Sequence, residues 1–112
     1  MIPWRCVSVG LMEYRRGRSQ EAIAYCERCL TLDTSNPARS ATAQVIMAMA
    51  HHQAGDSKLA RLELAEIRGV IDKKFAASLD MGNGTEGYWF DWLLARILLR
   101  EAVGLIEAGP AN

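Results

Sequence analysis

The chain has 112 residues, of which 50% are hydrophobic and 23% are charged, and its 13 Lys and Arg balance 13 Asp and Glu. This size and composition are those of one ordinary globular domain and argue against a disordered chain. We expect no nucleic-acid partner, because phosphate binding normally requires a basic excess. We also expect no direct membrane contact, because no apolar run reaches the roughly 18 residues of a membrane span.

The chain repeats itself at a shift of 38 residues, which pairs Gly17 with Gly55 and Ala22 with Ala60. In both copies a helical pattern ends at the glycine, a serine follows two residues later, and a second helical pattern begins. Glycine closes helices because it readily adopts the left-handed conformation. Each copy therefore predicts a helix hairpin.

The first four predicted helices begin at capping or first-turn residues and end at a glycine, a turn or a pair of cations. They run from Pro3 to about Arg16, from an N-cap at Ser19 to a turn at 33–36, from Pro37 to Ala54, and from an N-cap at Asp56 or Ser57 to Lys73 and Lys74.

Residues 75–87 lack helical periodicity and contain three of the nine glycines, which predicts an irregular loop that is either mobile or functional. A fifth helix is expected from Tyr88 to about Ala108, closed by Gly109. This helix is apolar nearly all round, so it cannot face water alone. It must pack over the last hairpin, against a second chain, or against a continuation of the protein.

The repeat resembles the tetratricopeptide repeat (TPR) family, in which small residues lie where two helices cross and a glycine lies at the turn between them. The matching residues are Gly10, Tyr14, Gly17, Glu21, Ala22, Leu30 and Asp33 in the first unit, and Ala48, Gly55, Ala60 and Leu64 in the second. The chain departs from the family in its longer unit and in having Cys6 and Gln44 where the family has an aromatic residue.

The resemblance implies one all-α domain over residues 1–112, a TPR-like right-handed solenoid of two helix-turn-helix repeats with a C-terminal capping helix. The implied boundaries are 3–36 for repeat 1, 37–74 for repeat 2, 75–87 for the loop and 88–109 for the capping helix.

A narrower resemblance is carried by residues 48–55 (AMAHHQAG) and 88–102 (YWFDWLLARILLREA). Both stretches are similar to the C-terminal TPR region of large bacterial serine/threonine protein kinases. The resemblance implies that this chain is the non-catalytic tail of a longer protein. The sequence has no glycine-rich phosphate loop, no His-Arg-Asp loop and no Asp-Phe-Gly motif, so we do not expect it to be an enzyme.

The pair Cys26 and Cys29 has the Cys-x-x-Cys spacing of zinc and redox sites. Both cysteines fall in the middle of a predicted helix and align with Leu64 and Ile67 of the second copy. We therefore interpret them, together with Cys6, as reduced core residues, which favours a reducing cytoplasm. No metal or other cofactor is expected.

The two histidines and an arginine cluster allow more than one interpretation. His51 and His52 point about 100° apart on a helix and cannot chelate one ion together. One could bind a ligand or sense pH, but the simpler interpretation packs one between helices and leaves the other on the surface. The cluster at residues 15–18 suits a helix C-terminus, and Arg15 could also grip a partner's carboxylate.

We predict a protein–protein interaction module that binds a protein or peptide in a groove formed by the first helix of each hairpin. Extending the family's geometry to this chain assigns that groove to Val7, Leu11, Tyr14, Arg15, Val45, Met49, His52 and Gln53. The alternative is self-association into a homodimer through the apolar fifth helix, with Trp89, Trp92 and Leu99 as the interface. Aromatic residues at this spacing also suit a ligand box or, more simply, a helix core.

Overall fold

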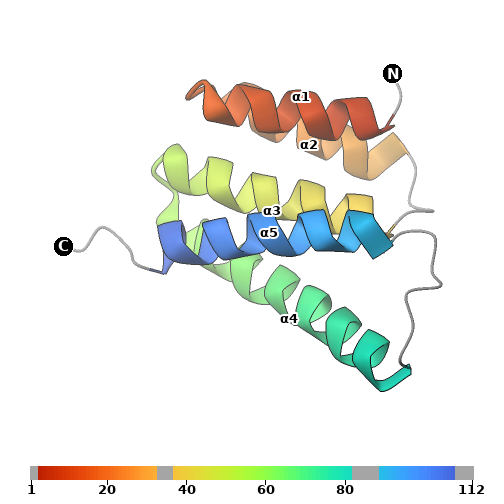
Figure 1. The fold of residues 1–112 in the computed structure, drawn as a ribbon. Helices are drawn as coiled ribbons and strands as arrows, with labels where there is room; N and C mark the ends of the chain where they lie inside the picture. Colours follow the sequence, from red (N-terminus) through yellow and green to blue (C-terminus); the bar gives the residue numbers. More distant parts are fainter. Residues whose placement is uncertain (1–2, 33–36, 82–88, 108–112) are drawn as a thin grey trace.

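A computed structural model describes residues 3–32, 37–81 and 89–107, and within them the side chains of 5–31, 37–76 and 92–107. These residues form five helices and no strand, which confirms the all-α prediction (Figure 1). The helices are α1 (Pro3–Arg15), α2 (Ser19–Leu32), α3 (Pro37–Gln53), α4 (Ser57–Met81) and α5 (Trp89–Ile106).

Two equivalent turns join α1 to α2 and α3 to α4. Gly17 and Gly55 adopt φ angles of 80° and 98°, the left-handed region predicted for them. After α1, the Gly17 N–H donates to the Tyr14 carbonyl at 3.0 Å and the Arg18 N–H donates to the Glu13 carbonyl at 2.8 Å. The same pair of bonds closes α3. Both turns therefore satisfy the last carbonyls of a helix in the same way, which confirms the two predicted hairpins.

The two second helices begin differently. The Asp56 carboxylate accepts a hydrogen bond from the Leu59 N–H at 3.2 Å, so Asp56 is the N-cap of α4. The predicted N-cap at Ser19 is wrong, because α2 begins directly after Arg18, whose carbonyl accepts the first backbone bond. The Ser19 hydroxyl instead donates to the Gln53 side-chain oxygen at 3.0 Å and links the two turns.

Helix α3 is the centre of the fold. It packs against each of the other four helices, with α5 alongside it, α1 and α2 to one side and α4 to the other (Figure 1). The molecule measures 41 × 35 × 18 Å. Because packed helices lie about 8–10 Å apart, the shortest dimension corresponds to two helix layers. Most side chains of α3 are therefore buried between neighbours.

Helix α4 is longer than predicted and continues past Lys74 to Met81. The predicted loop is therefore wrong for residues 75–81, and its remainder, 82–87, lies outside the described residues. Phe75 explains the difference: its side chain is only 7% exposed, and the Arg96 guanidinium of α5 lies 4.6 Å from its ring centre. Tertiary packing extends the helix where the local charge pattern predicted an end.

Helix α5 packs on α3 and α4, as the first of the three alternatives for its apolar surface predicts. Its outer face still carries exposed apolar side chains, at Leu94, Ile97 and Leu105. In the described part of the chain, no helix combines the length and the apolar character needed to cross a membrane.

Candidate functional site

The predicted partner-binding groove is not an open surface. Val7 is 3% exposed, and Val45 and Met49 are fully buried. The prediction is wrong for these three residues. The helices packed around α1 and α3 cover the faces that the predicted groove needs to be open. Tyr14 is also buried, and Leu11 is half-buried against the same core.

Arg15 makes its ion pair within the chain. Its guanidinium binds the Glu101 carboxylate of α5 through two hydrogen bonds, of which the Nη2–Oε1 bond measures 2.7 Å. The same guanidinium lies 5.6 Å from the centre of the Tyr14 ring. Burial, followed by the charge of Glu101, raises the pKa of Tyr14. Arg15 therefore joins α1 to α5 instead of presenting its fork to a partner.

The last two predicted groove residues lie at the C-terminal end of α3. The Gln53 side chain accepts a bond from Ser19 and donates to the Tyr14 carbonyl at 3.3 Å. His52 is half-buried. The eight predicted residues thus form core and helix joints, with no shared open groove.

The Arg15–Glu101 pair predicts a pH-dependent contribution to stability. The hydrogen bond from Arg15 lowers the pKa of Glu101 from its ordinary value of 4.5. A lowered carboxyl pKa stabilises the fold above the unfolded value, and this contribution is lost as the pH falls through the folded value. Because both side chains are more than a third exposed, we expect Glu101→Gln to cost no more than about 1 kcal/mol at neutral pH.

Urea unfolding of wild type and Glu101→Gln between neutral and acidic pH tests this expectation. The difference between them should shrink as the pH falls below 4.5. The matched control is Glu27→Gln on the exposed surface of α2, which should show no such convergence. A difference between wild type and Glu101→Gln that persists at low pH would contradict the assignment.

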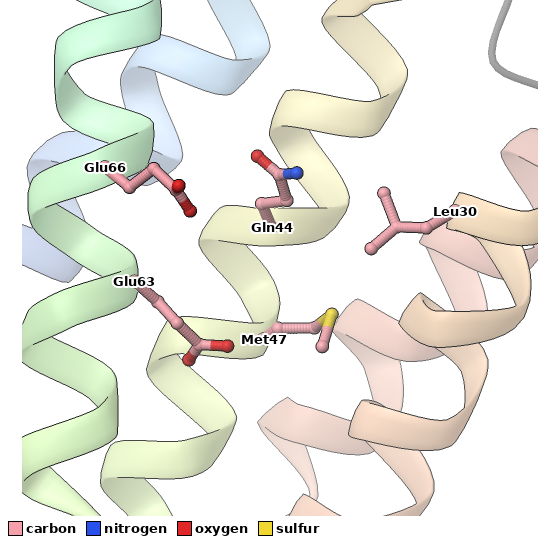
Figure 2. Close-up of a pocket in the computed structure, with 5 residues that line it drawn as sticks. All are labelled: Leu30, Gln44, Met47, Glu63 and Glu66. Atoms are coloured by element: carbon pink, nitrogen blue, oxygen red, sulfur yellow. The ribbon is translucent and has the colours of Figure 1, made fainter.

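A hollow of about 140 Å³ opens over α3, between α2 and α4. It is lined by Leu30, Gln44, Met47, Glu63 and Glu66. Figure 2 shows Gln44 and Met47 on the α3 floor, with Leu30 on one side and the two glutamates on the other, all directed into the space. We name this set the α2–α4 hollow.

The two glutamates of the hollow differ in their partners. The Glu63 carboxylate lies 2.6 Å from Nδ1 of His51, and both side chains are largely buried. Glu66 is exposed and has no hydrogen-bond or ion-pair partner among the described residues. The hollow therefore combines the apolar side chains of Leu30 and Met47 with one available carboxylate.

The histidines fit only part of the simpler interpretation. His51 packs between α3 and α4 against Glu63, but His52 is half-buried and not on the open surface. Among the described residues, no group of three or more His, Cys, Asp and Glu side chains is placed to hold a metal ion.

The three cysteines are core residues, as the alignment of Cys26 and Cys29 with Leu64 and Ile67 predicts. Each is fully buried, and each is a free thiol. Burial raises the pKa of Cys26 to about 12. Burial also raises the pKa of Cys29, although the nearby Arg39 charge opposes the shift. Thiolates are therefore scarce at this Cys-x-x-Cys pair, which disfavours redox or metal chemistry.

We expect the native protein to resist alkylation, because the thiolate is the reactive form and all three thiols are buried. Iodoacetamide labelling followed by mass spectrometry should modify the cysteines only in denaturant. Ser8→Cys, which adds an exposed thiol on α1, is the positive control and should label rapidly in the native state. Equally rapid native labelling of Cys26 would contradict its burial.

The predicted dimer interface is also corrected. Trp92 and Leu99 are each only 4% exposed and belong to the core, where the Lys74 ammonium lies 5.7 Å from the Trp92 ring centre. They point inward because α5 docks its aromatic and leucine side on the hairpin beneath it. The Trp89 side chain lies outside the described residues.

Sequence reasoning missed the α2–α4 hollow. Gln44 and His51 are seven residues apart in α3 and so share one face of the helix, with Met47 between them. Two polar residues seven positions apart on one face of the helix were the available signal.

No family model matches this chain, and the comparisons with curated proteins and with solved structures likewise found no match.

Proposed function

We propose that the chain is a non-catalytic protein-binding module built as a TPR-like, right-handed array of two hairpins with α5 as its cap. The repeated turn chemistry at Gly17 and Gly55 supports this proposal, as does the packing of α3 against both helices of the first hairpin. The sequence resemblance further suggests recruitment of a substrate to a bacterial serine/threonine kinase of which this chain would be the tail.

The observation that carries the proposal is the open α2–α4 hollow, where the available carboxylate of Glu66 faces Leu30 across a space that Met47 also lines (Figure 2). A lysine or arginine can lay its aliphatic stem on apolar side chains while its charged end reaches a carboxylate. The occupant that fits is therefore a peptide segment of a partner protein that carries apolar and basic side chains.

A fluorescein-labelled peptide of leucine and lysine, followed by fluorescence anisotropy, tests this proposal. We expect Glu66→Gln to weaken binding about fivefold, which corresponds to about 1 kcal/mol for an exposed ion pair. Glu27→Gln on α2 is the charge-matched control and should bind as wild type does. A leucine–glutamine peptide controls for the charge of the probe. No binding, or equal weakening in both variants, would refute the proposal.

Self-association remains the second candidate, carried by the outer face of α5. Leu94, Ile97 and Leu105 are 39%, 63% and 37% exposed, and helical geometry places them within about 80° of one another. Light scattering at increasing concentration tests this candidate. A dimer that Ile97→Glu converts to a monomer would support it, and a wild-type monomer at every concentration would exclude it.

A further inference from the structure

A second groove, of about 220 Å³, lies between α4 and α5. It is lined by Arg68, Asp72, Arg96, Leu99, Arg100 and Val103. The lining thus contains three arginines and one carboxylate, that of Asp72. Arg68 follows Glu66 by two positions, so the two side chains leave α4 about 200° apart. This α4–α5 groove is therefore separate from the α2–α4 hollow.

The three arginines differ in their interaction partners within the chain. Arg68 is already paired, with Nη1 2.9 Å from Glu107 and Nε 3.9 Å from Asp72. The guanidinium carbon of Arg96 lies over the Phe75 ring, 4.6 Å from the ring centre. Arg100 is exposed and has no hydrogen-bond or ion-pair partner in the described part of the chain.

The contact with Phe75 restrains the Arg96 guanidinium by a cation–π interaction. Phe75 is largely buried, so the ring itself is held in place by the core. The N–H donors of a guanidinium lie in one plane as a fork, which suits a carboxylate. Arg96 can thus offer these donors at a lower ordering cost than a free side chain.

Arg96 and Arg100 lie four residues apart, so they are neighbours on one face of α5. Like charges at this spacing repel each other, and no described carboxylate forms an ion pair with either one. An anion placed between them would remove this repulsion and accept hydrogen bonds from both. Leu99, largely buried, and Val103 supply apolar surface beside them.

We propose that the α4–α5 groove binds the carboxylates of an acidic segment of a protein, with Arg96 and Arg100 as its donors. Neither arginine forms an ion pair among the described residues, and the two lie about one helical turn apart, near the spacing of neighbouring glutamates on a partner helix. A nucleic acid would instead require a row of cations along its phosphate backbone, and the chain has no net positive charge.

Fluorescence anisotropy with fluorescein-labelled hexaglutamate at low salt tests this groove. We expect Arg96→Gln/Arg100→Gln to weaken binding at least tenfold. The control with the same change in net charge is Arg5→Gln/Arg28→Gln, at exposed positions of α1 and α2 that do not line the groove. We expect this control to bind hexaglutamate within about twofold of wild type.

Arg100→Gln alone keeps the contact between Arg96 and Phe75, so it separates anion binding from a packing effect. It should weaken binding of hexaglutamate about threefold and leave the thermal melt unchanged. Equal weakening by the two double variants, no effect of Arg100→Gln, or no binding at all would overturn the proposal. Tighter binding of a short oligothymidine than of hexaglutamate would also overturn it and assign the groove to nucleic acid. Because the Glu66 test uses a basic probe, failure of either site is distinguishable from failure of the other.

Discussion

Replacing Met49 with alanine is expected to lower the free energy of unfolding by about 2–5 kcal/mol, the usual cost of emptying a core position. Met49 is fully buried in α3, the helix that contacts all the others. A cavity there removes contacts that neighbouring helices cannot easily restore. Urea unfolding monitored by circular dichroism measures the loss.

Met47→Ala is the matched control, since it removes the same side chain two residues earlier in the same helix. Met47 is half-buried at the edge of the α2–α4 hollow, so its loss should cost no more than about 1 kcal/mol. The two variants also distinguish the predicted groove, which includes Met49, from the observed hollow, which includes Met47. Met47→Ala should weaken binding of the leucine–lysine peptide. Equal stability losses would contradict the burial of Met49 and restore it as a groove residue.

The hairpins were predictable because their signals are local. A left-handed glycine closes a helix through bonds to residues only a few positions away, so Gly17 and Gly55 identify the two turns without knowledge of the fold. The end of α4 was not predictable in this way. Lys73 and Lys74 indicated a helix C-terminus, but Phe75 is buried near α5 and the helix continues to Met81.

The candidate site was harder to predict because α3 is buried on several sides. Its apolar residues recur nearly all round the helix, so the sequence does not indicate which side stays open. That choice depends on where α5 docks, and the docking depends on contacts between residues distant in the chain. Arg15 illustrates the same point, since Glu101, its partner, is 86 residues away.

Gly10→Ala is expected to destabilise the protein by about 1–3 kcal/mol, although alanine favours a helix more than glycine does. An added Cβ at Gly10 would lie 2.9 Å from the Cys26 sulfur, closer than such atoms pack. The next nearest atom, the Ala22 carbonyl oxygen, would lie at an ordinary contact distance of 3.5 Å, so the clash is with the sulfur. The fully buried Cys26 side chain has little room to move away, so the clash outweighs the gain in helix propensity.

Removing the sulfur should reverse the sign of this effect. In a Cys26→Ala background, adding Gly10→Ala is expected to stabilise the fold by about 0.5–1 kcal/mol, because only the helix propensity then remains. Gly69→Ala is the matched control, since no atom lies within 4 Å of a Cβ added there, and it should stabilise the wild type by a similar amount. Thermal and urea unfolding of the four variants form a double-mutant cycle with one external reference. Additive effects of the two substitutions would show that α1 and α2 do not cross at Gly10 and Cys26.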